Sequence, residues 1–378
     1  MNLLQDQHIL ILGLGNSGLA MLRWCLLQGA RVTVVDTRET PPSLQKLQEE
    51  KLHADFVHST FDAALVEGND IRAVFKSPGL SPVEVAGVWQ AAQAKGLWCG
   101  TELTLFAHAL EHLKNSEVSY QPKVLAITGT NGKTTVTRLT GLLLERAGMK
   151  VAVAGNIGPT LLDTLTQRLD DLPQVWVLEL SSFQLDGVDN FEATAACVLN
   201  LTQDHLDWHG DMAAYGKAKA HIYGQHAVGV LPRNDAAVMG LWPADSGRKK
   251  EVPRARLHFG ADLPQQPGDF GLSTDNGMTW LVRAHSAEDN GSKRGRVAEE
   301  ELQIQRLMPA DALRIRGRHN ALNALAALAL AGTCSNGLAQ MLHGLREYTG
   351  EPHRMSSVAV LNDIEYFDDS KGTNVGAT

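Results

Sequence analysis

The chain lacks the sequence features that mark secreted and membrane-spanning proteins. It has only four cysteines, which lie far apart and form no CxxC pair: Cys25, Cys99, Cys197 and Cys334. That pattern argues against a disulfide framework or a zinc site and is typical of reduced cytosolic thiols. The apolar run at residues 9–12 is cut short by glycines and lacks the basic start and cleavage site of a signal peptide. No apolar run approaches the roughly 20 residues that span a bilayer.

The chain also lacks an excess of positive charge. Its formal net charge is −8, and aromatic residues make up only 6% of it, without a basic stripe in which aromatic residues are interleaved. These properties argue against a nucleic-acid-binding surface. A hydrophobic content of 44% with 20% charged residues is that of an ordinary soluble enzyme. We therefore expect a cytoplasmic protein that neither binds nucleic acid nor inserts into a membrane.

The first hundred residues alternate between strand and helix patterns. The expected elements are a strand at 8–12, a helix at 16–28, a strand at 31–35 that ends at Asp36, and a strand at 73–75. Such alternation predicts a parallel sheet that binds ligands at the carboxyl ends of its strands. The polar segment 111–123 then predicts a domain boundary.

A second alternating unit begins at Val124. Its expected strands cover residues 124–128, 151–154, 175–180 and 195–199, with helices between them. Residues 241–305 contain scattered Pro, Gly and charges, from which we expect only short strands such as 257–259. Within this segment, the charged residues 286–301 predict an exposed loop. The Ala- and Leu-rich segment 321–331 predicts a buried helix.

A further unit begins near residue 351. Segments 358–361 and 365–367 have a strand pattern, but residues 351–378 are too few to form a core of their own. We expect three parts, which are residues 1–112, residues 121–350 and an incomplete third domain at residues 351–378.

The segment GTNGKT at residues 129–134, here called the phosphate loop, carries the strongest functional signal. It follows the buried strand pattern at 124–128 and precedes a helix that begins at Lys133. Backbone N–H groups in such a turn bind phosphate together with the positive end of the helix dipole. Lys133 would reach the β and γ phosphates, and the Thr134 hydroxyl would ligate Mg²⁺. The loop is shorter than the usual one, but it predicts a nucleoside-triphosphate site.

The segment GLGNSG at residues 13–18 predicts a second nucleotide site. It lies between a strand and a helix, and Asp36 ends the next strand. In this arrangement the glycines and the helix N-terminus hold a nucleotide diphosphate. The motif does not distinguish NAD from other nucleotide diphosphates.

Polar residues follow two other strands of the second unit. Glu179 lies at the end of the strand at 175–180, where a carboxylate can reach Mg²⁺ held by the phosphate loop. His205 follows the strand at 195–199 and is expected beside the same site. Both residues are therefore candidates for metal or phosphate binding.

Charged residues elsewhere give weaker signals. Arg354 and Asp369 lie at expected loop tips, where an Arg could neutralise a transferring phosphoryl group or simply be surface charge. Lys217 and Lys219 lie in a helical segment, and their pattern alone indicates solvent-exposed charge.

Taken together, these motifs resemble those of the Mur ligase family, from Ile9 to Thr378. GTNGKT marks the wider family. The more specific matches are GLGNSG (13–18), SPGL (77–80), GNIG (155–158), LELSSFQL (178–185), HNALNA (319–324), PHR (352–354) and DSKGTN (369–374). The resemblance implies an α/β fold with an N-terminal Rossmann-like domain, a central P-loop-type ATPase domain with a mostly parallel sheet, and the start of a third Rossmann-like domain.

The resemblance also implies the occupants of the two nucleotide sites. The N-terminal domain would hold UDP rather than NAD, and the residues implied for the UDP-linked substrate are Asn16, Ser17, Asp36, Thr37, Ser77, Gly79, Asn156, Ser181 and His205. Those implied for ATP are Gly129, Thr130, Asn131, Gly132, Lys133, Thr134, Thr135, Asn320, Arg354 and Asp369. Lys371 and Thr373 would lie near the incoming amino acid.

The resemblance further implies two Mg²⁺ ions and a modified lysine. The implied metal ligands are Thr134, Glu179, His205 and Lys219 as a carbamate, and the implied catalytic residues are Lys133, Glu179, His205 and Lys219. Carbamylation turns a cation into an anionic oxygen ligand and requires an unprotonated amine. The site must therefore depress the pKa of Lys219.

The implied activity is ATP-dependent addition of D-glutamate to UDP-N-acetylmuramoyl-L-alanine, through an acyl phosphate, in peptidoglycan synthesis. The partners would be these two substrates and ATP, and we expect a monomer. Because the third domain would contribute D-glutamate and ATP contacts, we expect residues 1–378 to bind the UDP substrate with little or no turnover.

Four alternatives compete with this interpretation. A ligase that adds L-alanine to UDP-N-acetylmuramate typically has His in place of Asn131. Folylpolyglutamate synthase lacks a UDP-binding domain of this type. An NAD-dependent oxidoreductase would explain residues 13–18 and Asp36 but leaves Lys133 without a role. The fourth alternative is a nucleotide-binding protein without catalytic activity.

Overall fold

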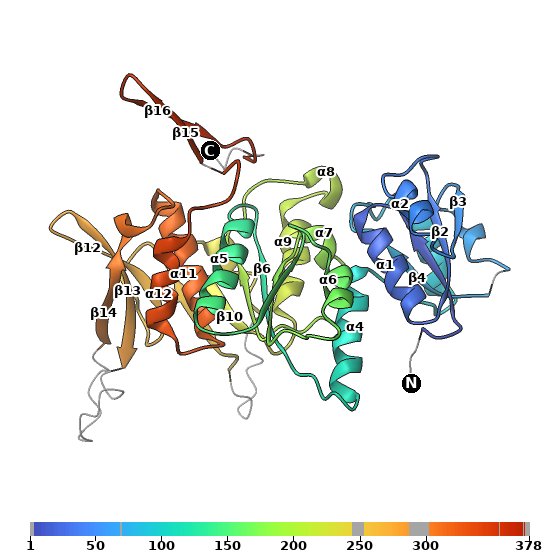
Figure 1. The fold of residues 1–378 in the computed structure, drawn as a ribbon, viewed down its shortest axis with the longest axis horizontal. Helices are drawn as coiled ribbons and strands as arrows, with labels where there is room; N and C mark the ends of the chain where they lie inside the picture. Colours follow the sequence, from blue (N-terminus) through green and yellow to red (C-terminus); the bar gives the residue numbers. More distant parts are fainter. Residues whose placement is uncertain are drawn as a thin grey trace.

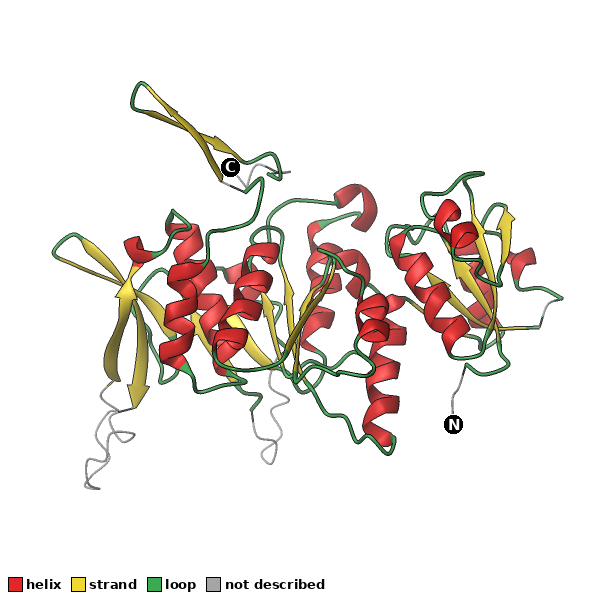
Figure 2. Ribbon diagram, viewed as in Figure 1, coloured by secondary structure: helices red, strands yellow, loops and turns green. Residues whose placement is uncertain are grey.

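The computed structural model describes residues 4–68, 70–243, 253–286, 302–354, 356–372 and 374. These residues form a five-stranded sheet, a nine-stranded sheet and a two-stranded hairpin, which follow one another along the chain (Figure 1). Helices lie against the two larger sheets (Figure 2). The predicted α/β class with parallel sheets is therefore confirmed.

The N-terminal sheet is parallel, with the strand order β3-β2-β1-β4-β5. In chain order its elements are β1 (His8–Leu12), α1 (Asn16–Leu27), β2 (Arg31–Asp36), α2 (Leu44–Glu49), β3 (Asp55–His58), a 3-10 turn (Ala63–Leu65), β4 (Ile71–Lys76), α3 (Ala86–Ala94) and β5 (Trp98–Gly100). From β1 the chain adds β2 and β3 on one side of the sheet, and it then adds β4 and β5 on the other side, so the strand order reverses between β1 and β4. The carboxyl ends of these two strands therefore flank the crevice in which such sheets bind ligands.

The central sheet has the order β14-β13-β12-β11-β10-β9-β6-β8-β7. Its strands are β6 (Lys123–Thr128), β7 (Val151–Gly155), β8 (Val175–Glu179), β9 (Ala195–Val198), β10 (Val228–Pro232), β11 (Arg256–Phe259), β12 (Phe270–Asp275), β13 (Met278–Ser286) and β14 (Leu302–Pro309). β6 lies between β8 and β9, and five of its six residues are buried. The segment that follows β6 therefore lies in the middle of a sheet edge, flanked by the ends of two parallel strands.

Helices surround this sheet. They are α4 (Glu102–Asn115), α5 (Lys133–Arg146), α6 (Leu161–Gln167), α7 (Ser182–Leu185), α8 (Leu206–His209), α9 (Met212–Ala220), α10 (Ala236–Met239), α11 (Arg318–Gly332) and α12 (Leu338–Glu347), with 3-10 turns at His221–Tyr223 and Ala310–Ala312. The expected buried helix at 321–331 is α11, whose Ala and Leu side chains pack against α5 in one apolar cluster. None of the helices in the described part of the chain is long and apolar enough to cross a membrane.

The prediction for residues 241–305 was wrong in part. β11 matches the short strand expected at 257–259, but β12, β13 and β14 form an antiparallel ladder that was not expected. Most side chains of β14 are exposed or half-buried, so the strand lacks the apolar alternation that a half-buried strand shows in sequence. Ser286 ends β13, and residues 287–301 of the predicted charged loop lie outside the described residues.

α4 joins the two sheets and belongs to the cores of both. Leu103 and Phe106 are buried in an apolar cluster that contains residues of β1, α1 and β8, and the rings of Phe106 and Trp176 pack edge to face at 5.1 Å. α4 continues to Asn115, so the boundary expected at residue 112 falls inside a helix. The division into residues 1–112, 121–350 and 351–378 stays a prediction.

β15 (Ser356–Leu361) and β16 (Ile364–Asp368) form an antiparallel hairpin, as the strand patterns at 358–361 and 365–367 indicate. In Figure 1 the hairpin extends away from the two sheets. Its large apolar side chains are exposed: Val358, Val360, Leu361, Ile364, Tyr366 and Phe367. The hairpin therefore adds no core of its own.

Glu102 is a buried carboxyl group where the helices of the two sheets meet. It begins α4, is 1% exposed and accepts a hydrogen bond from the backbone N–H of Leu162 at 3.0 Å. Burial raises the pKa of Glu102 to about 7, against the opposing effects of the Leu162 N–H and the Ser17 hydroxyl. The cause is that desolvation penalises the charged carboxylate.

We expect Glu102→Gln to remove a pH dependence of stability. The carboxyl group has its ordinary pKa of 4.5 when the protein is unfolded and a pKa of about 7 when it is folded, so the wild-type protein loses stability as the pH rises between these values. The free energy of unfolding of the variant minus that of the wild type should therefore rise by roughly 2–3 kcal/mol from about pH 5 to about pH 8. Denaturant unfolding at both pH values measures this, with Glu111→Gln on the exposed face of α4 as the control. A difference that is the same at both pH values would contradict the assignment.

Candidate functional site

The phosphate loop lies at the carboxyl end of β6. Gly132 has a φ of 80°, a left-handed conformation that favours glycine. A Cβ on Gly132 would also lie 2.8 Å from Asn323 Oδ1 of α11, so the loop is packed against a second helix. α5 begins at Lys133, and the N–H groups of its first turn have no partner within the helix. The loop therefore has the geometry that binds phosphate.

Asn200, which follows β9, holds the loop in place. Its Oδ1 accepts a hydrogen bond from the Asn131 N–H at 2.8 Å, and its Nδ2 donates to the Asn131 carbonyl at 3.0 Å. The Thr130 N–H donates to the Asn200 carbonyl at 3.1 Å. Asn200 was not among the predicted site residues. Its position directly after a strand that ends at the same sheet edge could have indicated its role.

Lys133 and Lys219 both reach the start of this loop. Lys133 Nζ donates to the carbonyls of Gly129 at 3.0 Å and Thr130 at 2.8 Å, and Lys219 Nζ donates to that of Gly129 at 3.0 Å. Lys219 is 1% exposed and lies over the Tyr215 ring. The indication that Lys219 is solvent-exposed was therefore wrong, because α9 turns this side chain toward the sheet while Lys217 stays exposed.

The environment lowers the pKa of both lysines. For Lys219 burial is the main cause and the nearby Lys133 cation adds to it, so the pKa lies well below its ordinary value. For Lys133 burial again lowers the pKa, while Glu179 opposes the shift. An anion bound at the loop would oppose these shifts and favour the charged form of each lysine.

Glu179 lies beside the loop at the end of β8. It is 1% exposed, and its Oε1 accepts a hydrogen bond from Asn156 Nδ2 at 2.8 Å. Its Oε2 is buried and has no hydrogen-bond partner within the described residues. A buried carboxylate oxygen without a partner is costly unless a cation or donor occupies the adjacent space, so Glu179 fits a Mg²⁺ ligand.

A pocket of about 430 Å³ opens beside the loop. Among its lining residues are seven that the sequence analysis assigned to ATP or the amino acid: Asn131, Gly132, Thr135, Asn320, Arg354, Asp369 and Lys371. Arg354 Nη2 donates to Thr134 Oγ1 at 3.1 Å across 220 positions of sequence. Asn374, which was not predicted, donates from its Nδ2 to Asp204 Oδ2 at 3.1 Å and to Asn131 Oδ1 at 3.2 Å.

His205 and Ser181 lie in segments that follow β9 and β8, the two strands beside β6. The His205 side chain is 47% exposed, and its ring lies 4.8 Å from that of Phe183. Ser181 Oγ accepts a hydrogen bond from the Gln184 N–H at 3.2 Å and caps α7. These contacts give local structural roles to both residues and do not test their predicted substrate contacts.

The predicted metal ligands do not form a complete protein cage. In the residues that the structure describes, no group of three or more His, Cys, Asp or Glu side chains is arranged to hold a metal ion. Mg²⁺ commonly takes most of its ligands from water and phosphate oxygens, so one buried carboxylate and a hydroxyl are compatible with it. Thr373, predicted near the amino acid, lies outside the described residues.

The second nucleotide-site candidate lies at the carboxyl ends of β1, β2 and β4. Asp36 is 2% exposed and accepts hydrogen bonds from the Leu14 N–H at 2.7 Å and from Arg38 Nη2 at 2.8 Å. Burial opposes the ionisation of Asp36, but these hydrogen bonds hold its pKa below its ordinary value. Ser77 Oγ donates to the Gly13 carbonyl at 2.9 Å. The GLGNSG turn is therefore tied to both neighbouring strands.

Close packing explains the last glycine of this turn. A Cβ on Gly18 would lie 2.0 Å from the Gly13 carbonyl oxygen, so only glycine lets α1 begin so close to the turn. The predicted contact residues Asn16, Thr37 and Gly79 are exposed nearby. Arg38 was missed, although it follows Asp36 by two positions.

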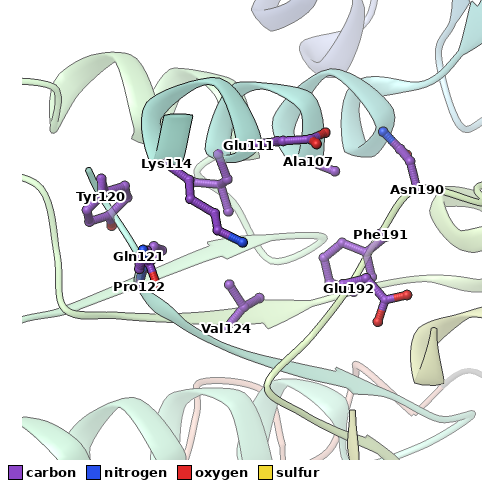
Figure 3. A pocket seen from close by; sticks show the side chains of 11 residues that line it. Ala107, Glu111, Lys114, Tyr120, Gln121, Pro122, Val124, Asn190, Phe191 and Glu192 are labelled. Carbon is purple, nitrogen blue, oxygen red and sulfur yellow. The ribbon is translucent and has the colours of Figure 1, made fainter. Parts of the chain in front are cut away.

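Another pocket, of about 450 Å³, lies between α4 and the segment 190–192 (Figure 3). Lys114, Glu111 and Glu192 are among its charged lining residues. Val124, at the start of β6, also lines it, so this pocket lies at the opposite end of the strand from the phosphate loop. It is therefore separate from the nucleotide site.

Comparison with known proteins identifies the family. The Mur ligase MurD-like N-terminal domain matches residues 7–98, and the Mur ligase middle domain matches residues 127–251. The chain is 62% identical, over its whole length and 75% of the relative, to the UDP-N-acetylmuramoylalanine–D-glutamate ligase of Albidiferax ferrireducens. The chain belongs to the Mur ligase family. A second ligase of the same name, from Burkholderia cenocepacia, is 53% identical over 99% of this chain and 75% of the relative.

This Mur ligase family member is an ATP-dependent ligase of peptidoglycan synthesis, and the predicted resemblance is confirmed. The family uses ATP and Mg²⁺. The UDP-N-acetylmuramate:L-alanyl-γ-D-glutamyl-meso-diaminopimelate ligase of Neisseria meningitides has a TM-score of 0.55 at 18% identity over 92% of this chain and 99% of that one, which confirms the fold. These findings do not favour an oxidoreductase or the ligase that adds L-alanine.

We expect Glu179→Gln to uncouple ATP binding from Mg²⁺. The amide removes the negative charge on the unpartnered oxygen, so ATP affinity in Mg²⁺ should fall about 10-fold or more. Affinity without Mg²⁺ should not fall, because a carboxylate next to phosphate only repels it. Calorimetric titration with and without Mg²⁺ measures both affinities, with Glu145→Gln on the exposed face of α5 as the control. Equal losses in the two conditions would contradict a metal role.

Proposed function

We propose that this chain binds ATP at the phosphate loop and UDP-N-acetylmuramoyl-L-alanine at the N-terminal sheet, and joins D-glutamate to the alanyl carboxylate. The observation that carries the proposal is the meeting of Arg354 with Thr134 of the phosphate loop, beside the unpartnered oxygen of Glu179. Relatives that are named for this activity support it, at 62% and 53% identity. A cytoplasmic, monomeric protein is part of the same proposal.

The reaction requires two anions to meet. An oxygen of the alanyl carboxylate attacks the γ-phosphorus of ATP, the bond to the ADP oxygen breaks, and an acyl phosphate forms. Lys133 and Arg354 lie where they can offset the negative charge that accumulates on the transferred group. The amine of D-glutamate then attacks the acyl carbon, loses a proton and displaces phosphate. Positioning of the reactants supplies much of the catalysis.

The residues present fit Mg²⁺ at this site. Glu179 offers a buried anionic oxygen and Thr134 a hydroxyl beside the predicted position of the phosphates. Mg²⁺ bound there would neutralise phosphate charge and orient the γ-phosphoryl group. We propose that two Mg²⁺ ions bind, with His205 near the second.

Carbamylation of Lys219 is consistent with its surroundings. Burial and Lys133 disfavour the ammonium form, so the unprotonated amine that reacts with CO₂ is more populated. Its nitrogen forms a bond to the carbon of CO₂, and a proton leaves to solvent. The product carries a negative charge, which Lys133 would attract rather than repel.

The UDP-linked substrate would bind at the GLGNSG turn and reach across to the phosphate loop. Backbone groups at residues 13–18 suit the diphosphate, and Asp36 lies where a ribose hydroxyl is held in such folds. Asn16 and Ser17 belong to this turn, Thr37, Ser77 and Gly79 lie near it, and Asn156, Ser181 and His205 belong to the central part. Lys371 and Thr373 are proposed for the amino acid, and Asn320 and Asp369 for ATP.

A panel of ligands tests this function. We expect the chain to bind UDP-N-acetylmuramoyl-L-alanine in preference to UDP-N-acetylmuramate and to NADH, as measured by calorimetry. Phosphate release from ATP by residues 1–378 should be slow compared with that by the Albidiferax ferrireducens ligase, the positive control, and what release occurs should depend on the first of these ligands and on D-glutamate. Preferential binding of UDP-N-acetylmuramate, with release driven by L-alanine, would establish the alternative ligase. Binding of NADH alone would overturn the proposal.

Carbamylation makes a separate prediction. In ¹³C-labelled bicarbonate we expect one slowly exchanging carbamate resonance in the wild-type protein, and we expect it to be absent from Lys219→Met. The matched variant Lys217→Met, on the exposed face of the same helix, should keep the resonance. A resonance that survives Lys219→Met would refute the assignment.

A further inference from the structure

Lys76 and Trp208 face each other from the two sheet-containing parts of the molecule. Lys76 is the last residue of β4, and Trp208 lies in α8 of the central part. Lys76 Nζ lies 5.4 Å from the centroid of a Trp208 ring. Neither residue has a role in the site described above.

Lys76 is a buried cation with few partners. It is 5% exposed, and its Nζ donates to the Leu80 carbonyl at 3.1 Å. An ammonium group can donate three hydrogen bonds. In the described part of the chain it forms no ion pair, and the charges of Asp186 and Glu84 act on it only from a longer distance. A buried charge without a close counter-ion is costly, so this position favours an added anion.

Trp208 provides a second unused donor. Its indole Nε1 is buried and has no hydrogen-bond partner within the described residues. The rings of Phe183 and His209 pack against Trp208 at 4.9 and 4.4 Å between centroids, which restricts the indole. A buried N–H without an acceptor is uncommon, so the indole can donate to a group that binds beside it.

We propose that Lys76 and Trp208 bind an anionic oxygen of the UDP-linked substrate, with one residue from the N-terminal part and one from the central part of the molecule. This inference rests on the proposed function. Ser77, the next residue along the chain, donates to the Gly13 carbonyl of the GLGNSG turn, so Lys76 lies beside the turn proposed for the diphosphate. The oxygen would accept hydrogen bonds from both Nζ and Nε1.

This contact would make the site selective for ligands that carry the anionic oxygen. A ligand that lacks the oxygen leaves two buried donors unsatisfied, so the site rejects uncharged analogues more strongly than one hydrogen bond on an exposed surface would. The oxygen also links β4 to α8, and binding therefore holds the N-terminal part against the central part. The source of the oxygen is either the diphosphate or the alanyl carboxylate, and a ligand series separates these two.

Calorimetric titration of Lys76→Met and Trp208→Phe with uridine, UDP, UDP-N-acetylglucosamine and UDP-N-acetylmuramoyl-L-alanine tests the proposal. Lys76→Met should weaken the binding of the charged ligands about 10- to 100-fold and leave uridine unchanged, because it removes a charged donor. Trp208→Phe keeps a ring but removes the N–H, and should weaken the same ligands about 3- to 10-fold. Lys76→Arg should retain most of the affinity, and Lys46→Met on the exposed face of α2 is the control.

The outcomes separate the alternatives. A loss that begins with UDP assigns the oxygen to the diphosphate, and a loss confined to UDP-N-acetylmuramoyl-L-alanine assigns it to the carboxylate; both support the proposal. Equal losses for uridine and UDP would show a structural role and overturn it. Unchanged affinities in Lys76→Met, with a wild-type protein that binds UDP, would overturn this inference alone. A wild-type protein that binds none of the charged ligands would overturn the proposed function as well.

Discussion

Two lysines on one carbonyl oxygen are the constraint on which the rest of the site depends. Lys133 and Lys219 both donate to the Gly129 carbonyl, so Lys219 lies close to the positive charge on Lys133, and burial together with that charge lowers the pKa of Lys219. Phosphate, a substrate carboxylate and a carbamate on Lys219 would each offset this charge. The surrounding structure keeps the arrangement rigid, since Asn200 fixes the loop and α11 packs against Gly132.

The two candidate nucleotide sites belong to different sheets, and one apolar core connects these sheets. α4 contributes Leu103 and Phe106 to a cluster that includes residues of both sheets. Glu102 and Lys76 are buried ionisable groups at the same junction, one a carboxyl group that burial tends to keep neutral and one a cation without a counter-ion. Glu102 bonds to Leu162 and Lys76 lies beside Trp208, so the ionisation of each group is tied to a contact between the two parts of the molecule.

Much of the fold was predictable because its central strands are buried on both faces. The strands at 8–12, 124–128 and 151–154 appear within one residue of their expected limits, since continuous apolar runs bounded by glycines leave few alternatives. β14 was missed because its mostly exposed side chains carry no such pattern. Asn200 and Asn374 were missed as loop partners because an asparagine after a strand or in a loop has no distinctive local signal.

The sequence by itself determined the backbone geometry of the phosphate loop, since the order of strand, glycines, lysine and hydroxyl at residues 124–134 acts locally. It also determined the family, through short motifs spread along the chain. Only the tertiary structure decided which distant side chains share that site. Lys219 has the same helical pattern as Lys217, and only the fold buries it beside Gly129. Glu179 Oε2 is buried, without a hydrogen-bond partner in the described residues, only because β8 lies next to β6. Burial and proximity arise between elements, so no local pattern records them.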